Sequence, residues 1–250
     1  MWQSYFSIGS ITIYFYGIFI SLGVLLGYLF ARKRSPKFNT PKEFLDTLLL
    51  ILLPSCILGA RIYHILSWFS YYKIFPKEIF FLWQGGFGVY GAIIAGLIVI
   101  FFFAKFKKIP FLSVLDLLSP SVLIAQAIGR IGNFFNFEGF GPPTNLPWKI
   151  YIPPDKRPIN FLDQSYFHPT FFYESILCLI SLLVILYLES RIKHSPGFVV
   201  GLYLAFYGLI RFFLEFLRFD TWVVSGIKIA QVLSLIFIFV ALVLIKKMIK

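Results

Sequence analysis

Seven long apolar segments dominate this sequence and restrict its fold more than any other feature. A helix that crosses a bilayer needs roughly 20 mostly apolar residues. Hydrophobic residues make up 59% of the 250 and charged residues 14%, whereas a soluble domain has about 45–50% and about 25%. The sequence therefore predicts an all-α polytopic membrane protein, a single integral membrane domain over 1–250 with about seven transmembrane helices. The segments lie at approximately 11–30, 45–67, 87–104, 113–135, 171–188, 198–216 and 227–245.

A proline-rich stretch at about 138–168 stands between the fourth and fifth apolar segments. Proline removes a backbone donor and interrupts helices, and such clusters are typical of loops. We therefore expect a small extramembrane cap here rather than another span. Its prolines are Pro142, Pro143, Pro147, Pro153, Pro154 and Pro158.

The 23 Lys and Arg against 11 Asp and Glu give a formal net charge of +12. In a soluble protein this excess would indicate nucleic-acid binding. Here thirteen basic residues follow the first, third, fifth and seventh segments, and seven lie on the opposite side. Because cytoplasmic loops are enriched in Lys and Arg, we predict an N-terminus outside, a C-terminus in the cytoplasm and no nucleic-acid partner. Trp68 and Trp83 lie near predicted outer ends, as aromatic belts do.

Polar side chains gather near the predicted outer ends of six segments. They include three arginines inside segments, Arg61, Arg130 and Arg211, and two carboxylates, Glu174 and Glu215. Ionisable residues inside spans usually face the bundle interior or a wet cavity. Arginine suits phosphate because its planar fork binds pairs of oxygens. Three arginines with two glutamates would leave a positive surplus, which predicts a phospholipid phosphate site at outer-leaflet depth.

Other readings of these arginines stay open. A single arginine near a helix end can extend to the interface, and ion pairs can simply hold helices together. A lipid transporter or flippase that recognises a phospholipid headgroup would also bury arginines, but such proteins often contain repeated halves, and no repeat is visible here. Asp116, near the inner end of the fourth segment, lies apart from the polar set.

The densest motif covers residues 129–141 and reads GRIGNFFNFEGFG. Gly129 and Gly132 allow close backbone approach. Arg130 and Asn133 are three residues apart and would share a face of a helix. Asn133 would then orient a headgroup hydroxyl or hold the arginine, and a polar helix end with glycine as a breaker is the alternative.

This stretch and four others resemble the phosphatidylglycerol–prolipoprotein diacylglyceryl transferases of bacteria. That family has the pattern G-R-x-G-N-F-x-N-x-E-x-x-G-x-x-T-x-L-P-W, which this chain matches from Gly129 to Trp148. The resemblance covers nearly the whole chain. The other matching residues are Tyr16-Gly17, Gly59-Ala60-Arg61, His168-Pro169-Thr170, Tyr173-Glu174, Tyr207-Gly208-Leu209-Ile210-Arg211-Phe212, Glu215, Arg218 and Asp220, with Asp116, Pro120 and Gln126 at the family's spacing.

The resemblance implies an enzyme that moves the diacylglyceryl group of phosphatidylglycerol to the thiol of the lipobox cysteine in a preprolipoprotein signal peptide. A thioether forms and glycerol phosphate leaves, as the first step of lipoprotein maturation in the bacterial inner membrane. No metal or cofactor is implied, and the active site would lie toward the outer leaflet. The residues carried over for the chemistry are Tyr90, Arg130, Arg211, Tyr16 and Tyr207. Those carried over for the headgroup are Arg130, Asn133, Glu138, Gly141, Arg61, Glu215 and Arg218.

Two departures from the family pattern matter for the chemistry. Tyr90 stands where the family often carries a histidine. An unperturbed histidine titrates near 6.5 and can act as a general base, whereas tyrosine, near 10, is a poor one. Tyr90 would then orient by hydrogen bonding, or the positive field alone would activate the thiol. His168 is a candidate substitute base, with a capping role before Pro169 as an equal alternative, and Phe167 replaces a frequent arginine.

Overall fold

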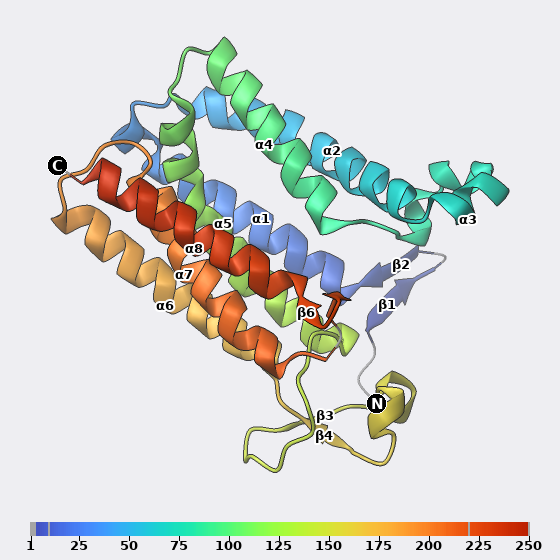
Figure 1. Cartoon of the computed structure of the whole chain (residues 1–250). Helices are drawn as coiled ribbons and strands as arrows, with labels where there is room; N and C mark the ends of the chain where they lie inside the picture. Colours follow the sequence, from blue (N-terminus) through green and yellow to red (C-terminus); the bar gives the residue numbers. More distant parts are fainter. Residues whose placement is uncertain (1–3, 10, 220, 250) are drawn as a thin grey trace. The chain divides into compact units, whose positions relative to one another are not determined.

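The structure is a computed structural model that describes residues 4–9, 11–219 and 221–249. Within that part of the chain, seven helices are long and apolar enough to cross a membrane (Figure 1). Each lies within a few residues of a segment predicted from the sequence, so the all-α polytopic fold is confirmed. The seven are α1 (Phe15–Arg34), α2 (Lys42–Ser67), α4 (Val89–Phe106), α5 (Phe111–Asn136), α6 (Thr170–Arg191), α7 (Phe198–Leu214) and α8 (Ile229–Met248).

Shorter elements fill the connections between these helices. One of them is the short α-helix α3 (Phe69–Ile74). The 3₁₀ helices are η1 (Ser35–Phe38), η2 (Pro76–Phe80), η3 (Leu82–Gln84), η4 (Pro154–Lys156), η5 (Ile159–Phe161) and η6 (Glu215–Leu217). The antiparallel strand pairs are β1 (Tyr5–Ile8) with β2 (Ile11–Tyr14), β3 (Ile150–Tyr151) with β4 (Tyr166–Phe167), and β5 (Val223–Val224) with β6 (Ile227–Lys228).

The first span begins later than the sequence predicts. Residues 11–14 form strand β2 rather than the first turn of a helix, and Tyr14 pairs with Tyr5 across the hairpin. The alternation of Ile, Thr, Ile and Tyr suits a strand, and Gly9 has a φ of 61° in the turn. Helix α1 therefore starts at Phe15.

The chain divides into two compact units, which are Met1–Ala31 with Leu115–Lys250, and Arg32–Val114. The first unit contains nearly all of α1 and α5 together with α6, α7, α8 and the 138–168 cap. The second contains α2, α3 and α4. The single integral membrane domain over 1–250 stays a prediction.

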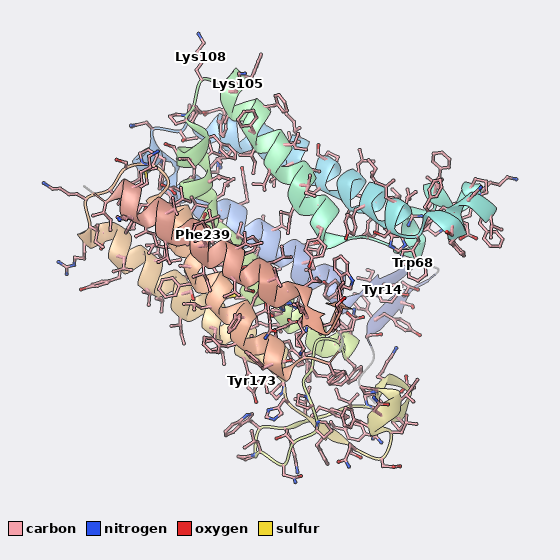
Figure 2. The ribbon with its side chains drawn as sticks, in the orientation of Figure 1. Tyr14, Trp68, Lys105, Lys108, Tyr173 and Phe239 are labelled. Carbon is pink, nitrogen blue, oxygen red and sulfur yellow. The ribbon has the colours of Figure 1, made fainter. Side chains whose placement is uncertain are left out.

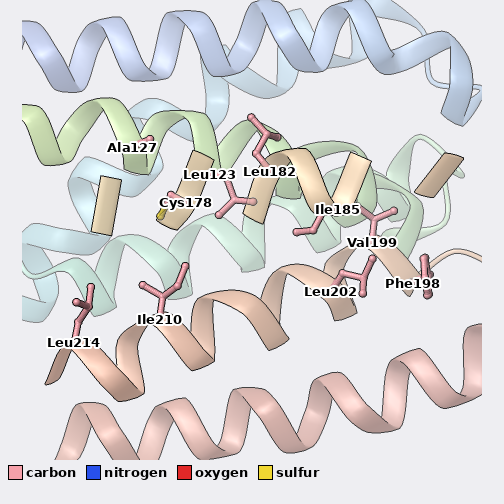
Figure 3. Close-up of a cluster of buried hydrophobic side chains, with 10 residues drawn as sticks. All are labelled: Leu123, Ala127, Cys178, Leu182, Ile185, Phe198, Val199, Leu202, Ile210 and Leu214. Atoms are coloured by element: carbon pink, nitrogen blue, oxygen red, sulfur yellow. The ribbon is translucent and has the colours of Figure 1, made fainter. Parts of the chain in front are cut away.

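The core of the first unit lies where α5, α6 and α7 meet (Figure 3). Glycines bring α8 onto α7: a Cβ added at Gly201 would lie 3.1 Å from Ile245, and one at Gly208 would lie 3.0 Å from the Ser234 carbonyl oxygen. Small residues allow this close approach between membrane helices, where packing rather than water exclusion holds helices together. The core residues are Leu123, Ala127, Cys178, Leu182, Ile185, Phe198, Val199, Leu202, Ile210 and Leu214.

Asp116, which the sequence left outside the polar set, caps helix α7. Its carboxylate accepts hydrogen bonds from the amides of Gly197 at 2.7 Å and Val200 at 2.8 Å. The first amides of a helix lack partners within it, and negative charge there also interacts favourably with the helix dipole. Asp116 is fully buried, so it joins α5 to α7 inside the first unit.

The 138–168 connection folds as a cap over a small aromatic core of its own. Phe140, Ile152, Phe167 and Phe171 form this core. Phe167 is 0% exposed, so the position where the family often carries an arginine is a packing position here. The cap contains only short helical turns and the β3–β4 pair.

The second unit pairs α2 with α4 through small residues. A Cβ added at Gly59 would lie 2.6 Å from the Gly91 carbonyl oxygen, so the two backbones nearly touch. Figure 2 shows Trp68 at one end of this unit and Lys105 and Lys108 at the other. Basic residues typically mark the cytoplasmic end of a span, while aromatic residues occur at both interfaces, and the orientation in the membrane stays a prediction.

Candidate active site

Helix α5 places Arg130 and Asn133 on one face, as their spacing predicts. The Arg130 Nη1 atom lies 3.5 Å from the Asn133 Oδ1 atom. Gly132 lies against α1, where a Cβ would be 3.1 Å from the Tyr16 ring and 3.2 Å from Phe19. The glycine therefore lets the α1 tyrosine approach α5 within one turn of the arginine.

Glu174 connects three helices of the first unit. Its Oε1 atom lies 2.8 Å from Arg130 Nη2, and its Oε2 atom lies 3.8 Å from Arg211 Nη1. The Tyr207 hydroxyl donates a hydrogen bond to Oε1 at 3.3 Å. Glu174 is only 2% exposed. One buried carboxylate on α6 thus holds an arginine from α5 and an arginine from α7.

A second buried carboxylate, Glu215, continues this chain of charges. Arg211 Nη2 donates to its Oε2 atom at 3.0 Å, one helical turn away. The Thr221 hydroxyl donates to Oε1. Lys228 donates from Nζ to the main-chain carbonyls of Glu215 at 2.5 Å and Arg218 at 2.7 Å. Both arginines therefore meet in one network with Glu174 and Glu215.

The arginine side chains of the network are partly exposed, whereas its carboxylates are buried. The side chains of Arg130 and Arg211 are 25% and 18% exposed, against 3% for Glu174 and 0% for Glu215. The Arg211 Nη1 atom is buried and has no hydrogen-bond acceptor among the described residues, because Glu174 at 3.8 Å is too distant for one. A buried donor without an acceptor is costly, so this nitrogen marks where an added oxygen ligand would gain a strong bond.

Comparison with known proteins identifies the family. The family model described as "Prolipoprotein diacylglyceryl transferase" matches residues 3–246. A relative from Nostoc sp., named phosphatidylglycerol–prolipoprotein diacylglyceryl transferase, is 44% identical over 235 residues, which cover 91% of this chain and 82% of the relative. A relative of the same name from Fervidobacterium nodosum is 39% identical over 236 residues, covering 94% of this chain and 81% of the relative.

The chain belongs to the prolipoprotein diacylglyceryl transferase family. The resemblance seen in the sequence is confirmed. In this transferase the Arg130, Arg211, Tyr207 and Glu174 side chains of the family motifs all join one network.

Three further motif residues lie where the cap joins the helices of the first unit. The Gly141 amide donates to the His168 carbonyl at 2.8 Å, and a Cβ at Gly141 would lie 2.8 Å from the Leu217 carbonyl oxygen. The need for glycine at this position is thus explained by packing. Glu138 is exposed, and its amide donates to the Asn133 carbonyl at 3.1 Å in the turn that ends α5. The headgroup roles of Gly141 and Glu138 stay predictions.

Arg61 has a different environment in the second unit. Its guanidinium donates to the carbonyls of Ile79 at 3.1 Å, Gly85 at 2.7 Å and Gly86 at 3.3 Å, and also to the Glu78 carbonyl. It lies over the Tyr72 ring, 5.3 Å from the centroid, and is 4% exposed. Arg61 therefore anchors the 78–86 loop. The contact of Arg61 with the headgroup stays a prediction. The surplus of positive charge, which was obtained by including Arg61, also stays a prediction.

Helix α3 contains one group outside the spans whose pKa is shifted. The Tyr71 hydroxyl donates to the Glu78 carboxylate at 2.6 Å. That hydrogen bond raises the pKa of Tyr71 above its usual range. The bond ties α3 to the loop that Arg61 anchors.

Tyr90 occupies the first turn of α4 in the second unit. Its ring lies 5.9 Å from the Tyr63 ring between centroids, and the residue is half-buried. Its hydroxyl has no hydrogen bond to a residue that the structure describes. The orienting role of Tyr90 stays a prediction, and Asp220, the last residue of the family match, lies outside the described residues.

Sequence reasoning missed two polar contacts that support the network. Lys228 is one of the seven basic residues on the predicted outer side, and it donates to the carbonyls of Glu215 and Arg218 just after α7. Tyr203 stacks on Tyr207 with 5.8 Å between ring centroids, and its hydroxyl accepts from Gln126 Nε2 at 3.1 Å. The four-residue spacing of the two tyrosines on α7 was the available signal. Among the described residues, no group of His, Cys, Asp and Glu side chains is arranged to hold a metal ion.

Proposed function

We propose that this chain transfers the diacylglyceryl group of phosphatidylglycerol to the thiol of the lipobox cysteine of a preprolipoprotein. The cysteine sulfur forms a bond to the sn-3 carbon of the diacylglycerol while the carbon–oxygen bond to phosphate breaks. The electron pair of that bond leaves with glycerol phosphate, and the thiol proton passes to the released phosphate or to water. The relatives' printed names and the family match support the substrates.

The observation that carries this proposal is the pair of partly exposed arginines held by buried carboxylates. Charge grows on the leaving phosphate as the carbon–oxygen bond breaks, and preorganised donors stabilise such charge best where water is excluded. Arg130 and Arg211 are held in place by Glu174 and Glu215, so they need little reorganisation. Arg211 Nη1, which has no hydrogen-bond acceptor among the described residues, would supply one donor to the phosphate.

The neighbouring polar groups fit the rest of the headgroup. Asn133 lies beside Arg130 and carries an amide that can bind a glycerol hydroxyl. Tyr207 reaches Glu174, and Tyr16 lies against Gly132 on the adjoining face of α5. Glu138, Gly141 and Arg218 complete the proposed headgroup set of the first unit, and the roles of Arg61 and Tyr90 stay predictions from the sequence.

The proposal also includes a place and an orientation. The protein would span the bacterial cytoplasmic membrane with its N-terminus outside and its C-terminus in the cytoplasm. The Arg130–Glu174–Arg211–Glu215 network would then lie toward the outer leaflet, where phospholipid phosphates lie and where exported prolipoproteins arrive. Seven apolar helices and the relatives' bacterial sources support the membrane placement.

Reconstitution of the purified protein tests the proposal directly. In nanodiscs that contain phosphatidylglycerol labelled in its acyl chains, a lipobox peptide should gain the label through a thioether. The same peptide with serine in place of cysteine, and nanodiscs with phosphatidylcholine alone, should give no product. Absence of transfer together with measured movement of lipid between leaflets would instead favour a lipid transporter.

A further inference from the structure

Hydrogen bonds connect the aromatic side chains of Trp148, Tyr173 and His168 where the cap meets α6. The Trp148 indole donates from Nε1 to the Tyr173 hydroxyl oxygen at 2.7 Å. The same hydroxyl lies 3.2 Å from the His168 Nδ1 atom. Tyr173 stands in the first turn of α6, and Figure 2 shows it where the cap joins the helices of the first unit.

The backbone of His168 is fixed as firmly as its ring. Its carbonyl accepts from the Gly141 amide at 2.8 Å, and its amide donates to the Pro142 carbonyl at 3.0 Å. A Cβ at Gly141 would lie 3.0 Å from the His168 Cβ and 2.8 Å from the Leu217 carbonyl oxygen. His168 therefore lies near Leu217 in η6, the short helix that follows α7 and begins at Glu215.

The chain of hydrogen bonds has a direction. An indole nitrogen can only donate, so the Tyr173 oxygen accepts in the first bond and its own proton remains to be donated. His168 Nδ1 is the acceptor within reach of that proton among the described residues, and in this arrangement Nδ1 is the unprotonated ring nitrogen. A neutral imidazole with Nδ1 as acceptor carries its proton on Nε2. Nε2 makes no hydrogen bond to any described residue.

We infer that Tyr173 is a positioning residue that holds His168 as the Nε2–H tautomer, so that His168 donates a hydrogen bond to an oxygen of the lipid headgroup. The inference rests on the proposed function for the identity of the ligand. A nitrogen that already carries a proton cannot take the thiol proton. The arrangement therefore gives His168 the role of a headgroup donor in place of the base predicted from the sequence.

Two amide substitutions of His168 separate the donor role from the base role. Glutamine places an N–H near the position of Nε2, and asparagine places its amide near Nδ1. His168→Gln should keep a KM for phosphatidylglycerol within about twofold of the unaltered protein, whereas His168→Ala and His168→Asn should raise it about tenfold with little change in kcat. Loss of activity in His168→Gln equal to that in His168→Ala would overturn the donor role.

Tyr173→Phe tests the positioning role. It removes the hydroxyl and keeps the ring, so it should raise the KM for phosphatidylglycerol about fivefold at nearly constant kcat. Tyr187→Phe is the matched control, because Tyr187 lies on the same helix, is 60% exposed and has no hydroxyl hydrogen bond among the described residues. Equal KM values for Tyr173→Phe and the control would show that Tyr173 does not position His168.

Nitrogen NMR reads the tautomer without depending on activity. The chain has 3 histidines, so the His168 signals in ¹⁵N-histidine-labelled protein are the ones that His168→Gln removes. At neutral pH we expect the spectrum to show a protonated Nε2 and an unprotonated Nδ1 that accepts a hydrogen bond. The ¹⁵N chemical shift of Nδ1 should change in Tyr173→Phe. The ¹⁵N chemical shift of Nε2 should change when phosphatidylglycerol is added to phosphatidylcholine nanodiscs. A protonated Nδ1 overturns the inference. If transfer fails while the tautomer is as expected, the proposed function is wrong and the positioning role stands.

Discussion

Arg61 in the second unit and the pair Arg130 and Arg211 in the first are the same residue type in equally apolar helices, but their partners differ. Arg61 donates only to main-chain carbonyls and is 4% exposed. Arg130 and Arg211 face buried carboxylates, and their side chains are 25% and 18% exposed. Neutral carbonyls satisfy donors inside a fold, whereas carboxylates behind an exposed guanidinium fix its orientation and leave part of it for a ligand.

The contrast suggests a criterion for distinguishing a structural arginine from one proposed to bind a ligand within a membrane helix. All three positions break the same hydropathy rule, because charge inside a span is costly. What distinguishes them is whether every donor already has an acceptor. Arg61 uses three of its nitrogens on the 78–86 loop, while Arg211 keeps a buried nitrogen without an acceptor among the described residues.

The largest expected effect is on the binding pair. Arg211→Ala and Arg130→Ala should each lower the rate of diacylglyceryl transfer at least about a hundredfold, because removal of one preorganised donor to a developing oxyanion costs about that much. The rate of peptide labelling in nanodiscs measures it, with thermal unfolding as a check on folding. Full activity in either variant would remove that arginine from the phosphate site.

Next in size is the loss of the loop anchor. Arg61→Met should lower the stability of the protein by about 3 kcal/mol, because several buried carbonyls lose their donor together. A thermal melt in detergent measures the change, and Arg61→Lys should recover part of it. If Arg61→Met keeps the melting temperature of the unaltered protein but raises the KM for phosphatidylglycerol, Arg61 is a headgroup ligand. The distinction between Arg61 and the pair Arg130 and Arg211 would then be wrong.

A smaller effect is expected from the carboxylate behind the pair. Glu174→Gln keeps an acceptor but removes its charge, so the two arginines lose their common anchor and the rate should fall about tenfold. If positive charge alone governed the site, the same variant would bind phosphatidylglycerol more tightly and react at least as fast. A split between KM and kcat in labelled-lipid transfer decides between these outcomes, and Glu189→Gln on the same helix tests for a general effect of buried carboxylates.

The smallest effect is expected at Tyr90. Tyr90→Phe should slow transfer about fivefold if the Tyr90 hydroxyl makes one hydrogen bond to the substrate. Tyr90→His should be more active than Tyr90→Phe. Tyr63→Phe serves as the control for aromatic packing, because the Tyr63 ring packs beside the Tyr90 ring. An unchanged rate in Tyr90→Phe would remove this tyrosine from the chemistry and leave the thiol to be activated by the positive field.

Much of the site was predictable because its residues repeat at helical spacing. Arg130 with Asn133, and Arg211 with Glu215, meet as three- and four-residue spacing requires. The link through Glu174 could not be derived in this way, because Tyr207 and Glu174 are 33 positions apart and lie on different helices. The proximity of Lys228 to the end of α7 likewise depends on the β5–β6 turn.

The sequence by itself determined the seven spans, the proline-rich cap and the family, because hydropathy and motif order are local properties of the chain. It also set the arginines apart, since charge inside an apolar run is visible without coordinates. Only the tertiary structure decided which arginines face carboxylates and which faces carbonyls, that Asp116 binds the amide of Gly197, 81 positions later, at the start of α7, and that Phe167 belongs to the cap core. Each of these depends on a partner brought from a distant part of the chain, and no local pattern encodes which partner arrives.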